Sequence, residues 1–143
     1  MDPRSRARGA ATAARLGIGF VPYSPLGHGV LTGHIRSMDD LDDNGWRNTS
    51  PRFMGDNFER NLHIADEVQA IAAEAGATPA QVALAWLLTK GDQIAPVPGT
   101  KRVTRVEENV AATAVPLSPE QVAKLDNLTL RRPATITTSS RCR

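Results

Sequence analysis

A strand, a tight turn and a basic helix follow one another directly in residues 94–109, and this order constrains the fold more than any other feature. The apolar run that contains Ile94 and Val97 predicts a short buried strand. Pro98 and Gly99 end this strand, because both residues are typical of turns. The helical spacing of three valines predicts one apolar helix face: Val103, Val106 and Val110. The segment is therefore interpreted as a βα unit.

The turn of this βα unit has the features of a phosphate-binding site. Gly99 lets the main chain approach a ligand closely, and the first turn of the helix offers free N–H groups to an anion. Three cations lie close to the start of the helix: Lys101, Arg102 and Arg105. Arginine binds phosphate through two parallel hydrogen bonds, and lysine acts as a point charge. On these residues alone, a phosphate pocket and a solvated basic helix on an ordinary βα unit both remain open.

Two segments of the chain resemble the two cofactor loops of aldo-keto reductases. The first, similar to the last βα loop of that family, is Pro98-Gly99-Thr100-Lys101-Arg102 with Arg105, Glu108 and Asn109. The second, similar to the loop after the preceding strand, is Gly19-Phe20-Val21-Pro22-Tyr23-Ser24-Pro25-Leu26-Gly27. The apolar residues Ile18, Phe20 and Val21 predict that residues 16–23 form this preceding strand, buried and parallel. Both matches occur in the order of the family and at a similar separation, so together they are more specific than either alone. The resemblance covers residues 16–128.

This resemblance implies an α/β fold, a partial (β/α)8 TIM barrel that consists of the last two βα units and a C-terminal helix. It also implies an NADPH-dependent oxidoreductase, which transfers hydride between a carbonyl and an alcohol. The expected cofactor-binding residues are Tyr23, Ser24, Pro25, Leu26, Gly27, His28, Gly99, Thr100, Lys101, Arg105, Glu108 and Asn109. The resemblance assigns Tyr23 to the nicotinamide, His28 and its neighbours to the pyrophosphate, Thr100 to the 2′-phosphate, and Glu108 and Asn109 to the adenine. From the residues alone, Tyr23 could instead cap the core at the end of a strand.

The chain has no recognisable catalytic centre. In aldo-keto reductases the proton donor is a tyrosine, assisted by lysine, aspartate and histidine from the first half of the barrel, and none of these four positions can be matched here. The only tyrosine, Tyr23, is assigned to the cofactor. Glu107 and Glu108 are adjacent on a helix and point apart, so they do not form a paired-carboxylate site. No metal-ligand spacing occurs, and we expect neither a catalytic nor a metal-binding residue.

A complete (β/α)8 barrel takes about 250 residues, whereas this chain has 143. Three alternatives follow for its activity. It could be a C-terminal fragment of a reductase that is inactive alone, or half of a split enzyme. A split enzyme would reduce a small carbonyl substrate only when an N-terminal half completes it. Finally, it could be an NADPH-binding module without chemistry of its own.

Three segments are expected along the chain: a basic, disordered start (1–15), the C-terminal half of the barrel (16–130) and a disordered tail (131–143). Within the middle segment, apolar spacing predicts an amphipathic helix over residues 58–75. Two further helix starts are predicted by capping boxes: Thr78 with Gln81, and Ser118 with Gln121. The irregular stretch 34–57 corresponds, by the resemblance, to a mobile loop that closes over the cofactor: Trp46, Arg52 and Phe53 are its candidate residues.

The composition of the chain indicates which classes of partner are not expected. A net charge of +2 is close to balanced, and no aromatic residue interleaves with the N-terminal arginines, so we expect no nucleic acid. No apolar run approaches the roughly 18 residues of a membrane span, so we expect no membrane. The single cysteine, Cys142, excludes an internal disulfide and fits a reducing, cytoplasmic location. Two strands without neighbours leave an open sheet edge, which favours self-association.

Overall fold

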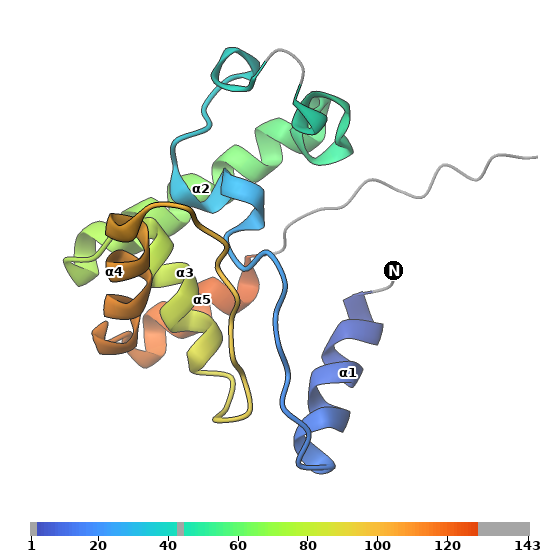
Figure 1. Cartoon of the computed structure of the whole chain (residues 1–143), viewed down its shortest axis with the longest axis vertical. Helices are drawn as coiled ribbons and strands as arrows, with labels where there is room; N and C mark the ends of the chain where they lie inside the picture. Colours follow the sequence, from blue (N-terminus) through green and yellow to red (C-terminus); the bar gives the residue numbers. More distant parts are fainter. Residues whose placement is uncertain (1–2, 43–44, 129–143) are drawn as a thin grey trace, which may run out of the picture.

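The computed structural model describes residues 3–42 and 45–128, and these residues are mostly helical (Figure 1). The α-helices are α1 (Pro3–Arg15), α2 (Gly55–Ala75), α3 (Pro79–Leu88), α4 (Val103–Ala111) and α5 (Pro119–Asn127). The 3-10 helices are η1 (Gly27–Thr32), η2 (Met38–Asp40), η3 (Trp46–Thr49), η4 (Pro51–Phe53) and η5 (Ala112–Ala114). Figure 1 shows α2 to α5 grouped together, whereas α1 stands apart at the end of an extended segment.

The two segments predicted as strands lie side by side and run parallel. Phe20 bridges Ile94, and Tyr23 bridges Val97. The Phe20 N–H donates to the Gln93 carbonyl at 2.7 Å, and the Phe20 carbonyl accepts the Ala95 N–H at 2.9 Å. The pairing consists of isolated bridges rather than a continuous ladder.

The prediction that both strands are buried is only partly right. Ile94 is buried, but Val97 and Val21 are more than half exposed. Within the described residues these two segments bridge only each other, and part of their apolar side chains remains exposed. Side chains on a barrel strand are buried only when neighbouring strands and helices cover them.

The core consists of two hydrophobic clusters, and α2 contributes to both. The first comprises Leu31, Ile64, Val68, Ile71, Ala72, Val82, Ala83 and Leu125. The second comprises Val30, Ile35, Leu41, Phe53, Phe58 and Ala65. The apolar residues of α2 therefore face inward at helical spacing, which confirms the amphipathic helix predicted over residues 58–75. The helix ends at Gly76, whose φ of 62° is the left-handed conformation that glycine adopts readily.

Both predicted capping boxes are present and confirm two helix starts. Before α3, the Thr78 Oγ1 accepts the Gln81 N–H at 3.2 Å, and the Gln81 side chain accepts the Thr78 N–H at 2.9 Å. Before α5, Ser118 and Gln121 make the same reciprocal pair at 3.2 and 3.0 Å. These bonds satisfy N–H groups that the first turn of a helix leaves without partners.

The two ends of the chain compare differently with the sequence prediction. Where residues 1–15 were expected to be disordered, the structure has α1, and its many alanines account for the helix because alanine has the highest helix propensity. The predicted tail, 131–143, lies outside the described residues. Within the residues that the structure describes, no single helix is long and apolar enough to cross a membrane; α2 and α3 would qualify only as a pair bent by 88°.

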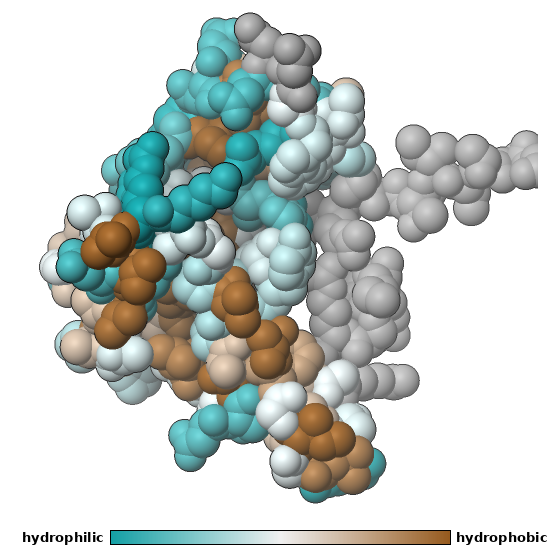
Figure 2. Space-filling model, in the orientation of Figure 1, coloured by the Kyte–Doolittle hydropathy of each residue, from teal (hydrophilic) through white to brown (hydrophobic). Residues whose placement is uncertain are grey.

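Helix α4 forms where the valine spacing predicts a helix, but its apolar face is not covered. Val103, Val106 and Val110 are 74%, 49% and 63% exposed. Figure 2 shows apolar side chains gathered on the surface over this helix. α4 packs on α3 through its opposite, polar side, which carries Arg105 and Glu108. An amphipathic pattern reports what a helix could cover, not whether a partner is present.

A matched pair of substitutions tests this exposure. Val106→Ser is expected to change the free energy of unfolding by less than about 0.5 kcal/mol, because the side chain already meets solvent. Val82→Ser, at a position on α3 that is 0% exposed, is expected to cost more than about 1 kcal/mol, because it removes buried apolar volume and buries a hydroxyl. Urea denaturation followed by circular dichroism gives both values. Equal losses in the two variants would show that the α4 face is covered in solution.

A polar cluster ties α3 to α5. The Trp86 Nε1–H donates to Asp126 Oδ1 at 2.7 Å, and the Lys90 ammonium pairs with the same oxygen. Lys90 also lies over the Trp86 ring, 4.9 Å from its centroid. The hydrogen bond from Lys90, then that from Trp86, lowers the pKa of Asp126 against the opposing effect of burial.

The lowered pKa of Asp126 predicts a pH dependence of stability. Because the folded-state pKa is below the unfolded one, the contribution is complete above the unfolded pKa and is lost as the pH falls through the folded pKa. Since the side chain is 48% exposed, we expect at most about 1 kcal/mol. In urea denaturation, the wild type should exceed Asp126→Ala at pH 6, and the difference should vanish by about pH 2. A difference that persists at the acid end would contradict this origin.

Candidate functional site

The two predicted cofactor loops begin next to each other. Tyr23, which starts the first loop, bridges Val97, which precedes the second. The Val97 N–H donates to the Pro22 carbonyl at 3.3 Å. Parallel strands place their carboxyl ends at one edge, where α/β folds bind ligands. The Tyr23 ring at this edge is 85% exposed, so it does not cap a core.

The first loop turns sharply through left-handed backbone conformations. Ser24, Gly27, His28 and Gly29 have φ angles of 50°, 61°, 60° and 101°. Positive φ is unfavourable for residues with a side chain, and such strain concentrates at ligand sites. The turn is closed by the Gly27 N–H, which donates to the Ser24 carbonyl at 3.0 Å, and by the Gly29 N–H, which donates to the Leu26 carbonyl at 3.1 Å. Pro25 and Leu26 are half-buried, and Leu26 packs against the first core cluster.

His28 contacts the stretch 34–57, which the resemblance predicts to be a mobile loop over the cofactor. Its ring lies edge-on to Trp46, with centroids 4.8 Å apart, and to Tyr23 at 6.2 Å. Its carbonyl accepts a hydrogen bond from Arg47 Nε at 3.1 Å. Burial, followed by the charges of Arg52 and Arg47, lowers the pKa of the imidazole. The stretch 34–57 therefore contacts the first cofactor loop and brings the guanidinium groups of Arg47 and Arg52 close to it.

The second loop is open to solvent at its start. Gly99, Thr100 and Lys101 are exposed, as is Arg102. The Thr100 hydroxyl accepts the Arg102 N–H at 3.2 Å just before α4 begins. These groups are accessible to an anion that approaches the loop from solvent.

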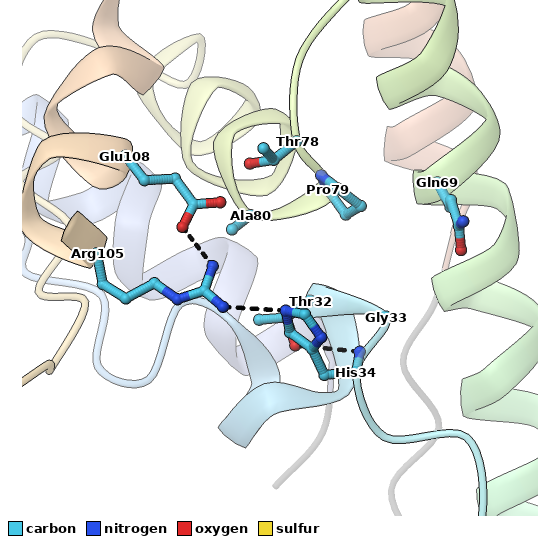
Figure 3. Close-up of a pocket in the computed structure, with 9 residues that line it drawn as sticks. All are labelled: Thr32, Gly33, His34, Gln69, Thr78, Pro79, Ala80, Arg105 and Glu108. Atoms are coloured by element: carbon cyan, nitrogen blue, oxygen red, sulfur yellow. Dashed lines mark hydrogen bonds and ion pairs between the residues drawn. The ribbon is translucent and has the colours of Figure 1, made fainter. Parts of the chain in front are cut away.

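A pocket of about 390 Å³ lies where the end of η1, the start of α3 and the inner side of α4 meet (Figure 3). Its lining residues are Thr32, Gly33, His34, Gln69, Thr78, Pro79, Ala80, Arg105 and Glu108. Arg105 reaches across the pocket: Nη1 pairs with Glu108 Oε2 at 2.5 Å, and Nη2 lies 3.0 Å from His34 Nε2. Figure 3 shows the guanidinium between these two partners. The structure thus brings one residue after the first loop into contact with the helix after the second.

Glu108 is held in place and in its charged form. Burial raises the pKa of this carboxyl, but hydrogen bonds from Arg105 and Thr78, with the charges of Arg105 and His34, outweigh burial and lower the pKa. Its main-chain carbonyl accepts a hydrogen bond from Gln81 Nε2 at 3.2 Å. An anion that binds Arg105 must therefore share the guanidinium with an ionised carboxylate.

The predicted residues thus fall into three places. Tyr23, Ser24, Pro25, Leu26, Gly27 and His28 form one turn; Gly99, Thr100 and Lys101 lie exposed before α4; Arg105 and Glu108 line the pocket, with half-buried Asn109 beside them. The sequence did not predict the opposite wall of the pocket, which includes His34, Gln69 and Thr78. His34 follows Gly33, which ends η1 at a φ of 74°, and this glycine was its only sequence signal.

Metal-binding geometry is not found among residues 3–42 and 45–128, where no group of three or more His, Cys, Asp or Glu side chains converges. The polar groups of the two loops and the pocket are instead cations, hydroxyls, main-chain N–H groups, amides, imidazoles and one carboxylate. Such groups bind and orient an anionic ligand.

The model of the aldo/keto reductase family matches residues 3–129. Aldo-keto reductase str7 of Strobilurus tenacellus is 44% identical over 117 residues, which are 82% of this chain and 35% of that protein. Aldo-keto reductase yakc [NADP(+)] of Schizosaccharomyces pombe is 44% identical over 108 residues, 76% of this chain and 32% of that protein. The chain therefore spans about a third of the length of these curated relatives.

Solved structures show a similar fold. The glycerol dehydrogenase AKR11B4 of Gluconobacter oxydans superposes with a TM-score of 0.73 at 21% identity, over 86% of this chain and 38% of that one. The thermostable aldo-keto reductase Tm1743, solved with the inhibitor epalrestat, gives 0.58 at 27% identity, over 84% of this chain and 33% of that one. These neighbours are (β/α)8 barrels, and the present chain corresponds to part of such a barrel.

Proposed function

The chain belongs to the aldo/keto reductase family, and from this premise we propose that it forms the NADP(H)-binding part of a carbonyl-reducing barrel. The observation that carries the proposal is the position of the two loops. They start side by side at the Tyr23–Val97 bridge, and the pocket behind them is spanned by the contact between His34 and Arg105. The NADP(+) in the name of the yakc relative agrees with the choice of cofactor.

Each part of the site fits a part of the dinucleotide. The exposed Tyr23 ring offers a flat face for the nicotinamide. The turn at Gly27 and His28 suits the pyrophosphate because Arg47 and Arg52 lie beside it, and guanidinium groups favour anions. Pockets that hold small ligands measure roughly 300–1,000 Å³, and the pocket at Arg105, of about 390 Å³, is within that range.

The adenosine end is proposed to occupy that pocket. Glu108 and Asn109 would contact the adenine edge, whereas Arg105, Lys101 and Thr100 would meet the 2′-phosphate. His34, absent from the sequence prediction, would approach the same phosphate because its ring lies 3.0 Å from Arg105. The surplus of cations at this end favours NADPH over NADH, since only the former carries the extra charge.

Bound NADPH would supply the hydride for reduction of a small carbonyl compound. The residues of this chain would bind the cofactor and orient its nicotinamide, but none of them is proposed to donate the proton that the alkoxide needs. That donor would belong to the remainder of the barrel. The unpaired strand edges and the exposed valines of α4 also support a barrel that this chain forms only in part, because further βα units would cover them. A cytoplasmic location and self-association of the isolated chain are part of this proposal.

A second function, that of an NADP(H)-binding module without chemistry of its own, is favoured by the kinds of side chain at the site. Tyr23, the only tyrosine, stands at the cofactor loop with its ring exposed. The side chains gathered at the loops and the pocket suit binding rather than proton transfer to a carbonyl. Both functions require the same cofactor site, and the addition of the missing barrel part with an aldehyde would separate them.

Isothermal titration calorimetry of the full 143-residue chain with NADPH and with NADH tests the shared claim. We expect saturable binding of NADPH, at least about tenfold tighter than NADH. Lys101→Ala should reduce this preference, whereas Lys124→Ala should leave it unchanged, because Lys124 lies on α5 near Glu74. Absence of NADPH binding, or equal affinity for both nucleotides, would refute the proposal.

A further inference from the structure

Asn61 is a buried polar residue whose position needs an explanation. It lies on α2 with 0% of its surface exposed. Its Nδ2 donates to the Arg52 carbonyl at 3.0 Å, whereas its Oδ1 has no hydrogen-bond partner among the residues that the structure describes. A buried acceptor without a partner destabilises the folded chain. An apolar side chain of similar volume would avoid that cost, but it could not hold the Arg52 carbonyl.

The carbonyl that Asn61 holds belongs to η4. A second amide of α2, from Asn57, donates to the Pro51 carbonyl of the same turn at 3.3 Å. Phe53, the last residue of η4, is fully buried in the second core cluster. The main chain at Arg52 is therefore fixed by two hydrogen bonds from α2 and by the buried ring of the next residue, which packs in the same cluster as Phe58.

This fixed main chain directs the Arg52 side chain at the first cofactor loop. Arg52 Nη1 lies 3.5 Å from the place where a Cβ on Gly27 would stand. Gly27 has a φ of 61° and precedes His28 in the left-handed turn. The guanidinium thus lies against the part of the loop where the main chain is most sharply turned.

We propose that Asn61 is a positioning residue, which fixes the main chain of Arg52 so that its guanidinium faces the turn at Gly27 and His28 and binds a diphosphate there. The diphosphate part rests on the function proposed above. The positioning part rests on the two hydrogen bonds and the burial of Asn61 and Phe53, and it can be tested without any nucleotide.

The nucleotide-free test is the pKa of His28, measured by NMR titration of the full chain. Arg52 and Arg47 are the charges that act on this imidazole, and the rings of Tyr23 and Trp46 flank it. Arg52→Gln should raise the pKa of His28, because it removes one of the two cations. Asn61→Leu should also raise the pKa of His28, because the Arg52 guanidinium would no longer be held near the imidazole. Asn57→Ala removes only the longer hydrogen bond, to Pro51, and leaves the Arg52 carbonyl bonded, so it should raise the pKa of His28 less than Asn61→Leu does.

Nucleotide binding supplies the second test. Asn61→Leu should lower the affinity for NADPH and the affinity for NADH by a similar factor, about three- to tenfold, because both nucleotides carry the diphosphate. A double-mutant cycle with Arg52→Gln should be non-additive, since both changes remove the same interaction. If Asn61→Leu does not fold, Asn61→Ser, whose hydroxyl cannot reach as far, replaces it.

The outcomes separate this proposal from the proposed function. An unchanged His28 pKa in a folded Asn61 variant would overturn the positioning role, because a merely structural residue lowers the melting temperature without moving that pKa. A raised His28 pKa in a chain that binds neither nucleotide would support the positioning of Arg52 and refute the cofactor site.

Discussion

Replacement of Phe53 by alanine is expected to lower the free energy of unfolding by about 3–5 kcal/mol, the usual cost of removing a buried aromatic side chain. Phe53 is 0% exposed, and its ring lies between Trp46, at 6.5 Å, and Phe58, at 6.2 Å. It therefore joins η3, η4 and α2 in one cluster. Since small domains have a total stability of about 5–15 kcal/mol, the variant should lose much of its folded population, which urea denaturation will measure.

The adjacent residue provides the control for this substitution. Met54 is 49% exposed, so Met54→Ala should change the free energy of unfolding by no more than about 0.5 kcal/mol. A small loss in Phe53→Ala, close to that in the control, would mean that the segment with η3 and η4 is not packed against α2 in solution. The account of Asn61 and Arg52 would then fail with it.

Replacement of Arg105 by alanine is expected to weaken NADPH binding by about 10- to 100-fold, with a much smaller effect on NADH. A hydrogen bond to a charged group contributes about 1.5–3 kcal/mol, and each 1.4 kcal/mol is about a tenfold change. Two effects act in the same direction. The variant loses the guanidinium that would meet the 2′-phosphate, and it leaves the carboxylate of Glu108 without the ion pair at 2.5 Å.

Two further variants isolate the role of Arg105. Arg105→Lys keeps the charge but not the planar fork, so its affinity for NADPH should lie between those of the wild type and Arg105→Ala. His34→Ala should weaken NADPH binding by a smaller factor, because it removes a neighbour of Arg105 but leaves the guanidinium itself in place. An Arg105→Ala chain that binds NADPH as tightly as the wild type would place the 2′-phosphate elsewhere.

The parts of the fold that the sequence predicts correctly depend on local interactions. The capping boxes at Thr78 and Ser118 are formed by residues three positions apart, and the spacing of α2 alone marks its buried face. The exposure of an apolar side chain cannot be predicted in this way, because it depends on which other elements pack over it. The same reasoning predicted an apolar face on α4 correctly, but it could not show that nothing in the described residues covers Val103 or Val110.

The candidate site divides in the same way. Arg105 and Glu108 were predicted through family motifs, and they line the pocket. His34 reaches Arg105 from 71 positions away in the chain, a contact that no local pattern encodes. Asn61 looks like an ordinary polar residue of an amphipathic helix, but in the structure it is fully buried and bonded to η4. Family motifs thus supply the groups that would bind the cofactor, whereas through-space packing supplies the groups that position them.

Chemical-shift mapping of the full chain with NADPH tests the central claim most directly, because it reports on each main-chain N–H separately. We expect the largest changes in two groups, Ser24 to Gly29 and Gly99 to Asn109, and a further change at His34, which contacts Arg105. NADH should reproduce the first group and the changes at Glu108 and Asn109, but it should lose the changes from Thr100 to Arg105, since it lacks the 2′-phosphate. Changes confined to other helices, or no saturable change with either nucleotide, would contradict an NADP(H) site formed by these two loops.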